Sequence, residues 1–390
     1  MAAPPPHTAA PGPGSSPPTG RPSSPSSPAH PSLRASLAPL AHSAPAPGAA
    51  ALSQLTTTDP TDRTTRRYAA TGTADTTTNR PVSRKDHFRI GSLTKSFTAV
   101  VVLQLAAEHR LTLDDTVEHH LPGLIRGHGN DGRDLTLRQL LTHTSGLYAY
   151  TDAPGAPLTP LTPLTPLTSP TPGSRTTSLD RHYTPTQLLR IALAHRPLFP
   201  PGTDWSYSNT NYTVLGLVIE KVTGRSYAEE ARRRIITPLR LTGTSFPGTD
   251  RRLPTPHGRA YSGTPPSTKD VTEIDPSGAG AAGEAISTLD DLNRFYAALL
   301  TGDLLPAPQL AAMRSTRSSD GAYGMGLMPT ELSCTTVWGH TGRIIGSYAA
   351  TAATADGHHV LTYRLNSDHP TDARRERALL EGEFCGRKQD

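Results

Sequence analysis

Hydrophobic and polar positions follow two different periods along the chain, and they predict strands near both ends with helices between them. Residues 31–58 have the pattern of a short helix, a Pro/Gly break and a weak strand, and residues 66–79 that of a second strand with a turn. Within residues 339–367, Asp356-Gly357 separates two alternating segments. We therefore predict a β-hairpin near the C-terminus.

The clearest helical pattern follows Ser92, where one largely buried side is predicted from Phe97, Val100, Val101, Leu103, Leu105 and Ala106. Further helices are predicted within residues 135–147, 184–195, 200–224, 226–241, 287–302 and 372–386. Ser287 with Asp290 three residues later is a capping pattern, and Gly302 fits a C-terminal stop.

This arrangement predicts an α+β fold, a mostly antiparallel sheet flanked by helices with an all-helical region inserted into it. We assign residues 31–95 and 275–387 to the sheet domain and residues 96–274 to the helical domain. Residues 156–174 repeat Pro-Leu-Thr, which favours polyproline II and excludes a helix. We interpret them as an exposed insertion, because helical patterning resumes on both sides. Residues 1–30, mostly Pro, Ala, Ser and Gly, predict a disordered tail.

Composition adds few constraints on function. The chain is 35% hydrophobic with a net charge of +5 and a sequence pI near 9.3. Its Arg residues are scattered, which argues against a nucleic-acid-binding face and leaves open a mild attraction to anionic surfaces. We find no run of 18 apolar residues, so we expect no membrane span, and residues 32–46 do not form a convincing signal peptide.

The two cysteines, Cys334 and Cys385, have neither a CxxC nor a zinc-type spacing, and no HExxH occurs among 16 His. We therefore expect no metal site and no cofactor. A disulfide between them would close a loop of about 50 residues, worth about 4 kcal/mol in the chain-entropy model. It would also indicate an extracytoplasmic protein, whereas two free thiols would not.

Ser92 and Lys95 form the first candidate for chemistry. Of the five lysines, only Lys95 has a serine three positions before it. Residues three apart share a face of a helix, and a serine nucleophile needs a base within hydrogen-bond reach. The positive potential of a helix N-terminus would also favour a developing oxyanion. The common alternative is a serine that only caps the helix.

Two further motifs favour the catalytic interpretation: Tyr207-Ser208-Asn209 after a Pro-Gly loop, and His340-Thr341-Gly342 at the start of a predicted strand. With these motifs the chain resembles the serine D-alanyl-D-alanine carboxypeptidases and class C β-lactamases, the penicillin-recognising serine hydrolases. The segments "FRIGSLTKSFTAVVVLQL", "LTHTSGL", "PGTDWSYSNTNYTVLGLVIEKVTG", "AISTLDDLNRF" and "YGMGL" carry the resemblance. "ELSC", "VWGHTG" and "EFCG" most resemble the soluble actinomycete carboxypeptidase/transpeptidase branch, and the resemblance covers roughly residues 31 to 387.

The resemblance implies a β-lactamase-like fold and an acyl-enzyme formed at Ser92. Lys95 and Tyr207 would share the proton transfers, and which of them is the base in acylation stays open. Asn209 would donate to the substrate amide and position Lys95. Tyr207 as a core tyrosine is the alternative.

The second half of the implied site comes from the predicted C-terminal hairpin. His340, Thr341 and Gly342 would line the cleft on an edge strand along which an extended peptide could lie, although His340 as a surface residue is the alternative. The backbone N–H groups of Ser92 and Arg343 would form the oxyanion hole. His143 in "LTHTSGL" is expected to be structural. The disulfide Cys334–Cys385 matches the cysteine positions of the relatives.

The activity implied is that of a D-Ala-D-Ala carboxypeptidase on peptidoglycan-type peptides, inhibited by penicillins. We expect a secreted or extracytoplasmic monomer with no nucleic-acid partner and no stable membrane span. Alternatives are a β-lactamase, an esterase, a D-amino-acid amidase, or a non-catalytic penicillin-binding protein. Met328 stands where the relatives have an Arg that helps to bind the substrate carboxylate, and Arg343 stands where they have Thr. Our hypothesis is that Arg343 takes over the carboxylate.

Overall fold

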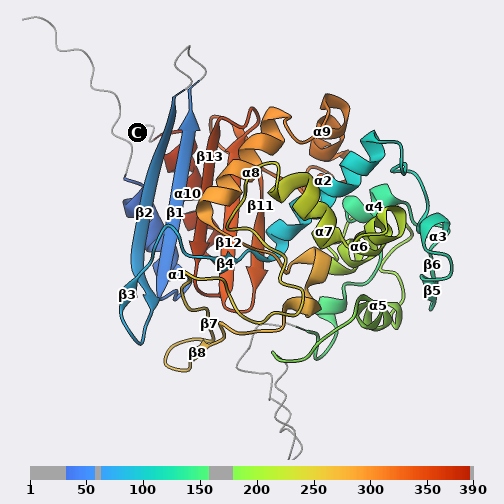
Figure 1. Cartoon of the computed structure of the whole chain (residues 1–390), viewed down its shortest axis with the longest axis horizontal. Coiled ribbons are helices and arrows are strands. Elements are labelled where there is room, and N and C mark those ends of the chain that lie inside the picture. Colours follow the sequence, from blue (N-terminus) through green and yellow to red (C-terminus); the bar gives the residue numbers. More distant parts are fainter. Residues whose placement is uncertain (1–31, 58–62, 158–178, 387–390) are drawn as a thin grey trace, which may run out of the picture.

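A computed structural model describes residues 32–57, 63–157 and 179–386, and its main feature is one antiparallel sheet with helices on both faces (Figure 1). The predicted tail at 1–30 and the repeat at 156–174, apart from Ala156 and Pro157, lie outside these residues. In spatial order the strands are β10 (Met328–Glu331), β11 (Thr336–Ile344), β12 (Ser347–Thr354), β13 (His359–Leu365), β1 (Gly48–Thr56), β2 (Thr64–Asp75) and β3 (Arg80–Pro81).

The two ends of the chain meet inside this sheet. β1 pairs with β13 from Ala49 opposite Leu365 to Leu55 opposite His359. Side chains of β1 alternate between two cores, so that Ala49 packs with α1 (Leu33–Ser43) and α10 (Ala373–Phe384), and Ala50 packs on the side of α8 (Leu289–Thr301). This pairing confirms the predicted sheet built from both ends of the chain.

Helix α2 (Thr94–Ala107) lies on the side of the sheet that carries α8, away from α1 and α10 (Figure 1). Its side chains are buried on nearly all sides, and Phe97 stacks on Phe295 with ring centroids 3.8 Å apart. The prediction that only one side of this helix is buried was therefore wrong, because neighbouring elements cover α2 on nearly all sides. The remaining helices are α3 (Val117–His120), α4 (Leu137–Leu141), α5 (Pro185–Leu193), α6 (Asn209–Thr223), α7 (Tyr227–Ala231), which continues into a π turn at Arg232–Ile236, and α9 (Ala307–Arg314).

Short strand pairs and 3₁₀ turns complete the described chain. The strand pairs are β4 (Phe88–Arg89) with β9 (Ile286–Ser287), β5 (Arg126–Gly127) with β6 (Asn130–Asp131), and β7 (Tyr261–Ser262) with β8 (Lys269–Asp270). The 3₁₀ turns are η1 (Gly91–Leu93), η2 (Tyr150–Asp152), η4 (Pro276–Gly278), η5 (Gly280–Ala282) and η6 (Arg317–Ser319).

Two local predictions differ from the structure. The N-cap of α8 is Thr288, whose side chain accepts from the amide of Asp291, because Ser287 is used in β9. Residues 339–367 contain three strands instead of two, since a turn at Gly346 (φ +73°) separates β11 from β12. The turn at Asp356-Gly357 joins β12 to β13 as predicted.

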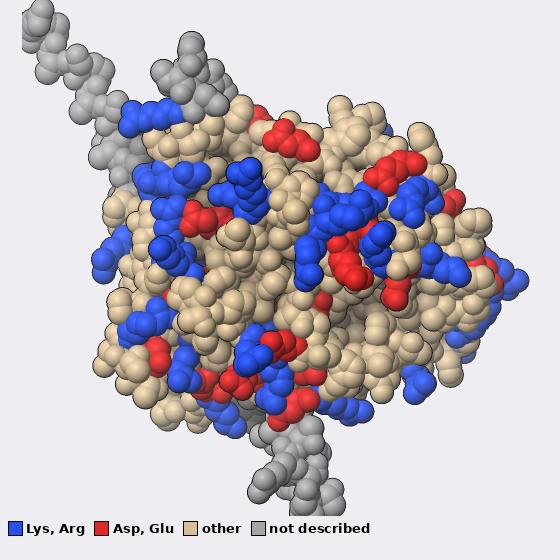
Figure 2. All heavy atoms as spheres, in the orientation of Figure 1, with Lys and Arg blue, Asp and Glu red and all other residues tan. Residues whose placement is uncertain are grey.

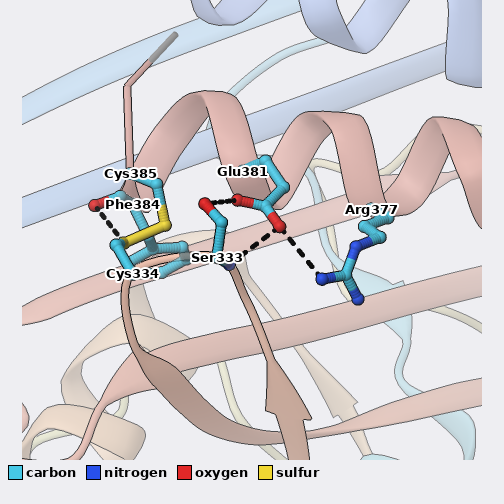
Figure 3. The surroundings of a disulfide bond; sticks show 6 residues. All are labelled: Ser333, Cys334, Arg377, Glu381, Phe384 and Cys385. Carbon is cyan, nitrogen blue, oxygen red and sulfur yellow. Dashed lines mark hydrogen bonds and ion pairs between the residues drawn. A yellow bond between two sulfur atoms is a disulfide. The ribbon is translucent and has the colours of Figure 1, made fainter. Parts of the chain in front are cut away.

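The disulfide Cys334–Cys385 ties the β10–β11 loop to the C-terminal end of α10, with the two Cα atoms 5.6 Å apart (Figure 3). Beside it, the Ser333 hydroxyl donates to Glu381 at 2.7 Å and Arg377 donates to the same carboxylate at 3.1 Å. The Ser333 hydrogen bond and the disulfide thus join the same two elements, whereas the contact of Arg377 with Glu381 lies within α10.

Basic and acidic side chains are interspersed on the face shown in Figure 2, as the scattered Arg predicted. Within the described ranges, none of the helices combines the length and apolar character that crossing a bilayer requires. The division into a sheet domain and a helical domain at residues 95/96 and 274/275 stays a prediction.

Candidate active site

Ser92 and Lys95 are brought together at the start of α2. Ser92 lies in the 3₁₀ turn η1, and Lys95 is in the first turn of the α-helix. Lys95 Nζ is 3.0 Å from Ser92 Oγ. The two side chains therefore lie within hydrogen-bond reach, as the spacing predicted.

The surroundings of Lys95 favour a neutral amine. Its side chain is 0% exposed, and this burial lowers the pKa of Lys95 well below its usual value. Nζ donates to Asn209 Oδ1 at 2.6 Å and to the carbonyl oxygen of Ala282 at 2.8 Å. Because both of these oxygens only accept, a neutral amine has its lone pair left for the Ser92 hydroxyl.

Tyr207 lies just before α6, beside both Lys95 and Ser92. Its ring centroid is 4.8 Å from Lys95 Nζ, and the Ser92 side chain has a lowering effect on the pKa of its phenol that is smaller than the effect of burial. Burial raises the pKa of Tyr207, so the phenol keeps its proton at neutral pH. Asn209, the first residue of α6, uses its amide oxygen for Lys95, and its Nδ2 donates to Thr151 Oγ1 at 3.1 Å.

His340 and Thr341 point to opposite sides of β11. His340 is 3% exposed, and its Nδ1–H donates to the Thr341 carbonyl, which leaves Nε2 to accept from the Tyr323 hydroxyl at 2.9 Å. Burial lowers the pKa of His340 to about 3. Thr341 is exposed. The strand is not at the sheet edge, which corrects the prediction. However, β10 pairs with β11 only as far as Gly339, so on that side no strand of the described chain pairs with the residues after it.

Two glycines allow the backbones of β11 and η1 to approach closely. A Cβ at Gly342 would lie 1.9 Å from the Ile90 carbonyl oxygen and 2.9 Å from the Ser92 amide nitrogen. A Cβ at Gly91, where φ is +52°, would lie 2.7 Å from the Arg343 amide nitrogen. The amides of Ser92 and Arg343 are therefore neighbours, as two donors to one oxyanion must be.

A cavity opens beside Ser92, lined by Ser92, Tyr150, Thr151, Pro157, Asn209, Gly278, Ala279, Ala282, Gly283, Arg343 and Ile344. The Arg343 guanidinium lies 5.7 Å from the ring centroid of Tyr348, and among the described residues no carboxylate forms an ion pair with it.

Sequence reasoning missed part of this cavity. Tyr150 donates to the Gly278 carbonyl at 2.8 Å, Thr151 holds Asn209, and the Ala282 carbonyl holds Lys95. Tyr150, Thr151 and Ala282 belong to no sequence motif whose spacing would have indicated a place in the cavity. Tyr323 lies within "YGMGL", one of the segments that carry the family resemblance. The segment gave no indication that Tyr323 contacts His340.

Asp115, His119 and His120 are the one group among the described residues with ligand atoms close enough to hold a metal ion, all within 4.8 Å. The Asp115 carboxylate is already hydrogen-bonded to His120 at 2.9 Å and to the Thr112 amide at 2.8 Å. Both contacts satisfy the carboxylate without a metal, and the predicted absence of a metal site stays a prediction.

Comparison with proteins of known sequence gives partial matches. "Protein flp" of Staphylococcus aureus strain N315 is 31% identical over 165 residues, which are 42% of this chain and 29% of that protein. The putative penicillin-binding protein PbpX of Bacillus subtilis is 28% identical over 240 residues, 61% of this chain and 52% of PbpX. The matches thus span about half or less of these relatives.

Solved structures match over most of their length. A D-stereospecific amidohydrolase from Streptomyces sp. is 40% identical with a TM-score of 0.78, covering 92% of this chain and 100% of that one. The D-amino acid amidase from Ochrobactrum anthropi SV3, complexed with L-phenylalanine amide, is 25% identical with a TM-score of 0.71, covering 90% and 95%. The family model described as Beta-lactamase matches residues 34–384. The chain therefore belongs to the beta-lactamase family of serine hydrolases.

Proposed function

We propose that the protein hydrolyses D-aminoacyl amides or peptides through an acyl-enzyme at Ser92. The observation that carries the proposal is the contact of 3.0 Å between Ser92 Oγ and a buried Lys95 whose other partners only accept. The Ser92 proton passes to the Lys95 amine while Oγ attacks the substrate carbonyl, and the amides of Ser92 and Arg343 bind the oxyanion. This assigns the base in acylation to Lys95.

The second half of the reaction uses the same groups. The tetrahedral intermediate expels the leaving amine, which takes a proton from the Tyr207 phenol, and the proton held by Lys95 restores the phenol. Water then attacks the Ser92 ester and gives a proton to the neutral Lys95 amine. The amine passes this proton to Ser92 Oγ as the ester bond breaks and the acid is released. The class of substrate is supported by the D-stereospecific amidohydrolase, 40% identical over its whole length, and by the lack of the carboxylate-binding Arg at Met328. An amide has no carboxylate to bind at that place.

The first experiment labels the protein with a fluorescent penicillin and locates the adduct by mass spectrometry. The second measures turnover of a panel of substrates: a D-amino-acid amide, its L isomer, an acyl-D-Ala-D-Ala peptide, an ester and a chromogenic cephalosporin. We expect one adduct on Ser92 and a preference for the D amide. Ser92→Ala should abolish labelling and turnover, and Lys95→Met should lower acylation at least about 10²-fold. Labelling that survives Ser92→Ala would overturn the proposal, and labelling without turnover of any substrate would indicate a non-catalytic penicillin-binding protein.

A D-Ala-D-Ala carboxypeptidase is the second candidate, and the position of Arg343 favours it. This exposed guanidinium lines the cavity and forms no ion pair among the described residues, so it is free to bind a terminal carboxylate bidentately. Arg343→Ala should then raise KM for a free-acid peptide at least about tenfold more than for its amide, whereas Arg343→Lys should lose less. An equal effect on both substrates would count against carboxylate binding by Arg343.

We further propose that the protein works outside the cytoplasm, because disulfides persist in oxidising compartments and Cys334–Cys385 is formed. Fractionation of the source cells with thiol alkylation before lysis tests this. Recovery in the cytoplasmic fraction with both cysteines alkylated would contradict it.

A further inference from the structure

His143 occupies a buried position between the helix α4 and the segment that carries Tyr207. Its side chain is 0% exposed, and its backbone has φ +61°, a left-handed conformation that is uncommon outside glycine but that histidine adopts more often than most residues do. The ring lies against the Tyr207 ring with centroids 4.3 Å apart. His143 therefore contacts a proposed catalytic side chain without reaching the substrate cavity.

The backbone on both sides of Tyr207 is held by His143. Its carbonyl oxygen accepts from the Ser206 amide at 3.0 Å, and its ring Nδ1 accepts from the Ser208 amide at 3.2 Å. One residue thus holds the amides of Ser206 and Ser208, the residues before and after Tyr207, which limits the positions open to the phenol.

The contacts of the ring decide its tautomer. Ser145 Oγ donates to Asn211 Oδ1 at 2.6 Å, which turns Asn211 Nδ2 toward His143 Nδ1 at 3.1 Å. Two N–H groups, from Ser208 and Asn211, therefore point at Nδ1, and neither can accept. The ring must be neutral with its hydrogen on Nε2. Burial lowers the pKa of His143 well below its usual value, in agreement with this state.

We infer that His143 is a positioning residue for the acyl-transfer reaction: its neutral ring, accepting at Nδ1, holds the Tyr207 phenol against Ser92. The inference rests on the proposed function, because the phenol matters only if Ser92 is acylated. A misplacement of about 1 Å in such a group can cost about 10²-fold in rate. The ring touches neither Ser92 nor the cavity, so substrate binding should be unaffected.

The test compares His143→Asn with His143→Gln, which carry the same amide group at different lengths. Asn places an oxygen where Nδ1 lies and tolerates the left-handed backbone, whereas the Gln amide extends to the position of Nε2. We measure the acylation rate constant and the non-covalent affinity for a fluorescent penicillin, with circular dichroism as the check on folding. His143→Asn should stay within about fivefold of the native rate, and His143→Gln should lose about 10²-fold in acylation with unchanged affinity.

A double-mutant cycle with Tyr207→Phe separates positioning from general support of the fold. If His143 acts through Tyr207, adding His143→Gln to Tyr207→Phe should cost less than about threefold. If His143→Gln does not fold, Asn211→Leu, which removes the second donor to Nδ1, replaces it in the same cycle. A native rate in the Gln variant, or losses that multiply fully with Tyr207→Phe, would overturn the inference. If labelling proves independent of Ser92, the proposed function fails instead.

Discussion

Glu284 is a buried carboxyl two residues after Ala282, the backbone partner of Lys95. It is 1% exposed, and its Oε1 accepts from the Tyr227 hydroxyl at 2.6 Å. Burial is the largest cause that raises the pKa of Glu284 from 4.5 to about 7, against the lowering effect of the Tyr227 hydrogen bond. Between these two values the folded protein holds a proton that the unfolded chain has lost.

This difference predicts the sign of a pH effect on stability. The stabilising contribution is present below the unfolded pKa of 4.5 and is lost as pH rises toward 7, a change of about 3 kcal/mol. Glu284→Gln keeps an acceptor for Tyr227 and does not titrate. The free energy of unfolding of this variant should therefore fall less between pH 5 and pH 8 than that of the native protein. Parallel pH profiles from urea unfolding would contradict the prediction.

At the residue scale, the sequence named the proposed reacting side chains but not the groups that surround them. Ser92 and Lys95 were named from their spacing, and Tyr207 and Asn209 from the family resemblance. All four line one cavity or contact its lining residues. The Ala282 carbonyl was not named, because a backbone acceptor carries no residue-type signal. The state of Lys95 depends on this acceptor and on burial.

At the scale of elements, the contact between β11 and η1 positions the proposed oxyanion hole. Gly342→Ala should force the two backbones apart, since its Cβ would lie 1.9 Å from the Ile90 carbonyl oxygen. Loss of one oxyanion donor costs about 10²–10³-fold in rate in serine hydrolases, and we expect a loss of that order in penicillin acylation.

The matched control is Gly339→Ala in the same strand, whose Cβ would lie 1.7 Å from the Thr351 carbonyl oxygen of β12 instead. Both variants should be less stable in thermal unfolding. When the acylation rate is expressed per folded molecule, only Gly342→Ala should be slower than the native protein. Equal rate losses in the two folded variants would argue against a special role of Gly342.

Most helices and the long strands were predicted from periodicity, whereas α3, α9 and the short strands were not. Two of the errors at the boundaries of predicted elements have local causes. Helix α8 begins one residue after its predicted start, because the backbone of Ser287 pairs in strand β9. The β11–β12 turn was missed because Gly346 follows two isoleucines without other turn residues. In both cases a tertiary pairing, absent from the local pattern, decided the boundary.

At the scale of the whole molecule, the disulfide closes a chain segment with a sequence separation of 51 residues. The double variant Cys334→Ser/Cys385→Ser should lose about 4 kcal/mol of unfolding free energy in the chain-entropy model. At denaturant concentrations below the unfolding transition, its penicillin acylation rate should not change. The disulfide joins the β10–β11 loop to α10, and α10 packs in the core that contains α1, whereas α2 belongs to the other core. Unchanged stability in urea unfolding would contradict this expectation.

The sequence by itself determined the family, most helices, the long strands at both ends of the sheet and the identity of the proposed reacting residues, because periodicity and short motifs are properties of neighbouring positions. Only the tertiary structure decided what surrounds them. It buries Lys95 beside two oxygens that only accept, brings the Arg343 amide to the Ser92 amide, and places His143 behind Tyr207. These contacts join residues that are about 64 to 250 positions apart in the sequence. The pattern of neighbouring residues carries no information on the spatial distance between residues so far apart.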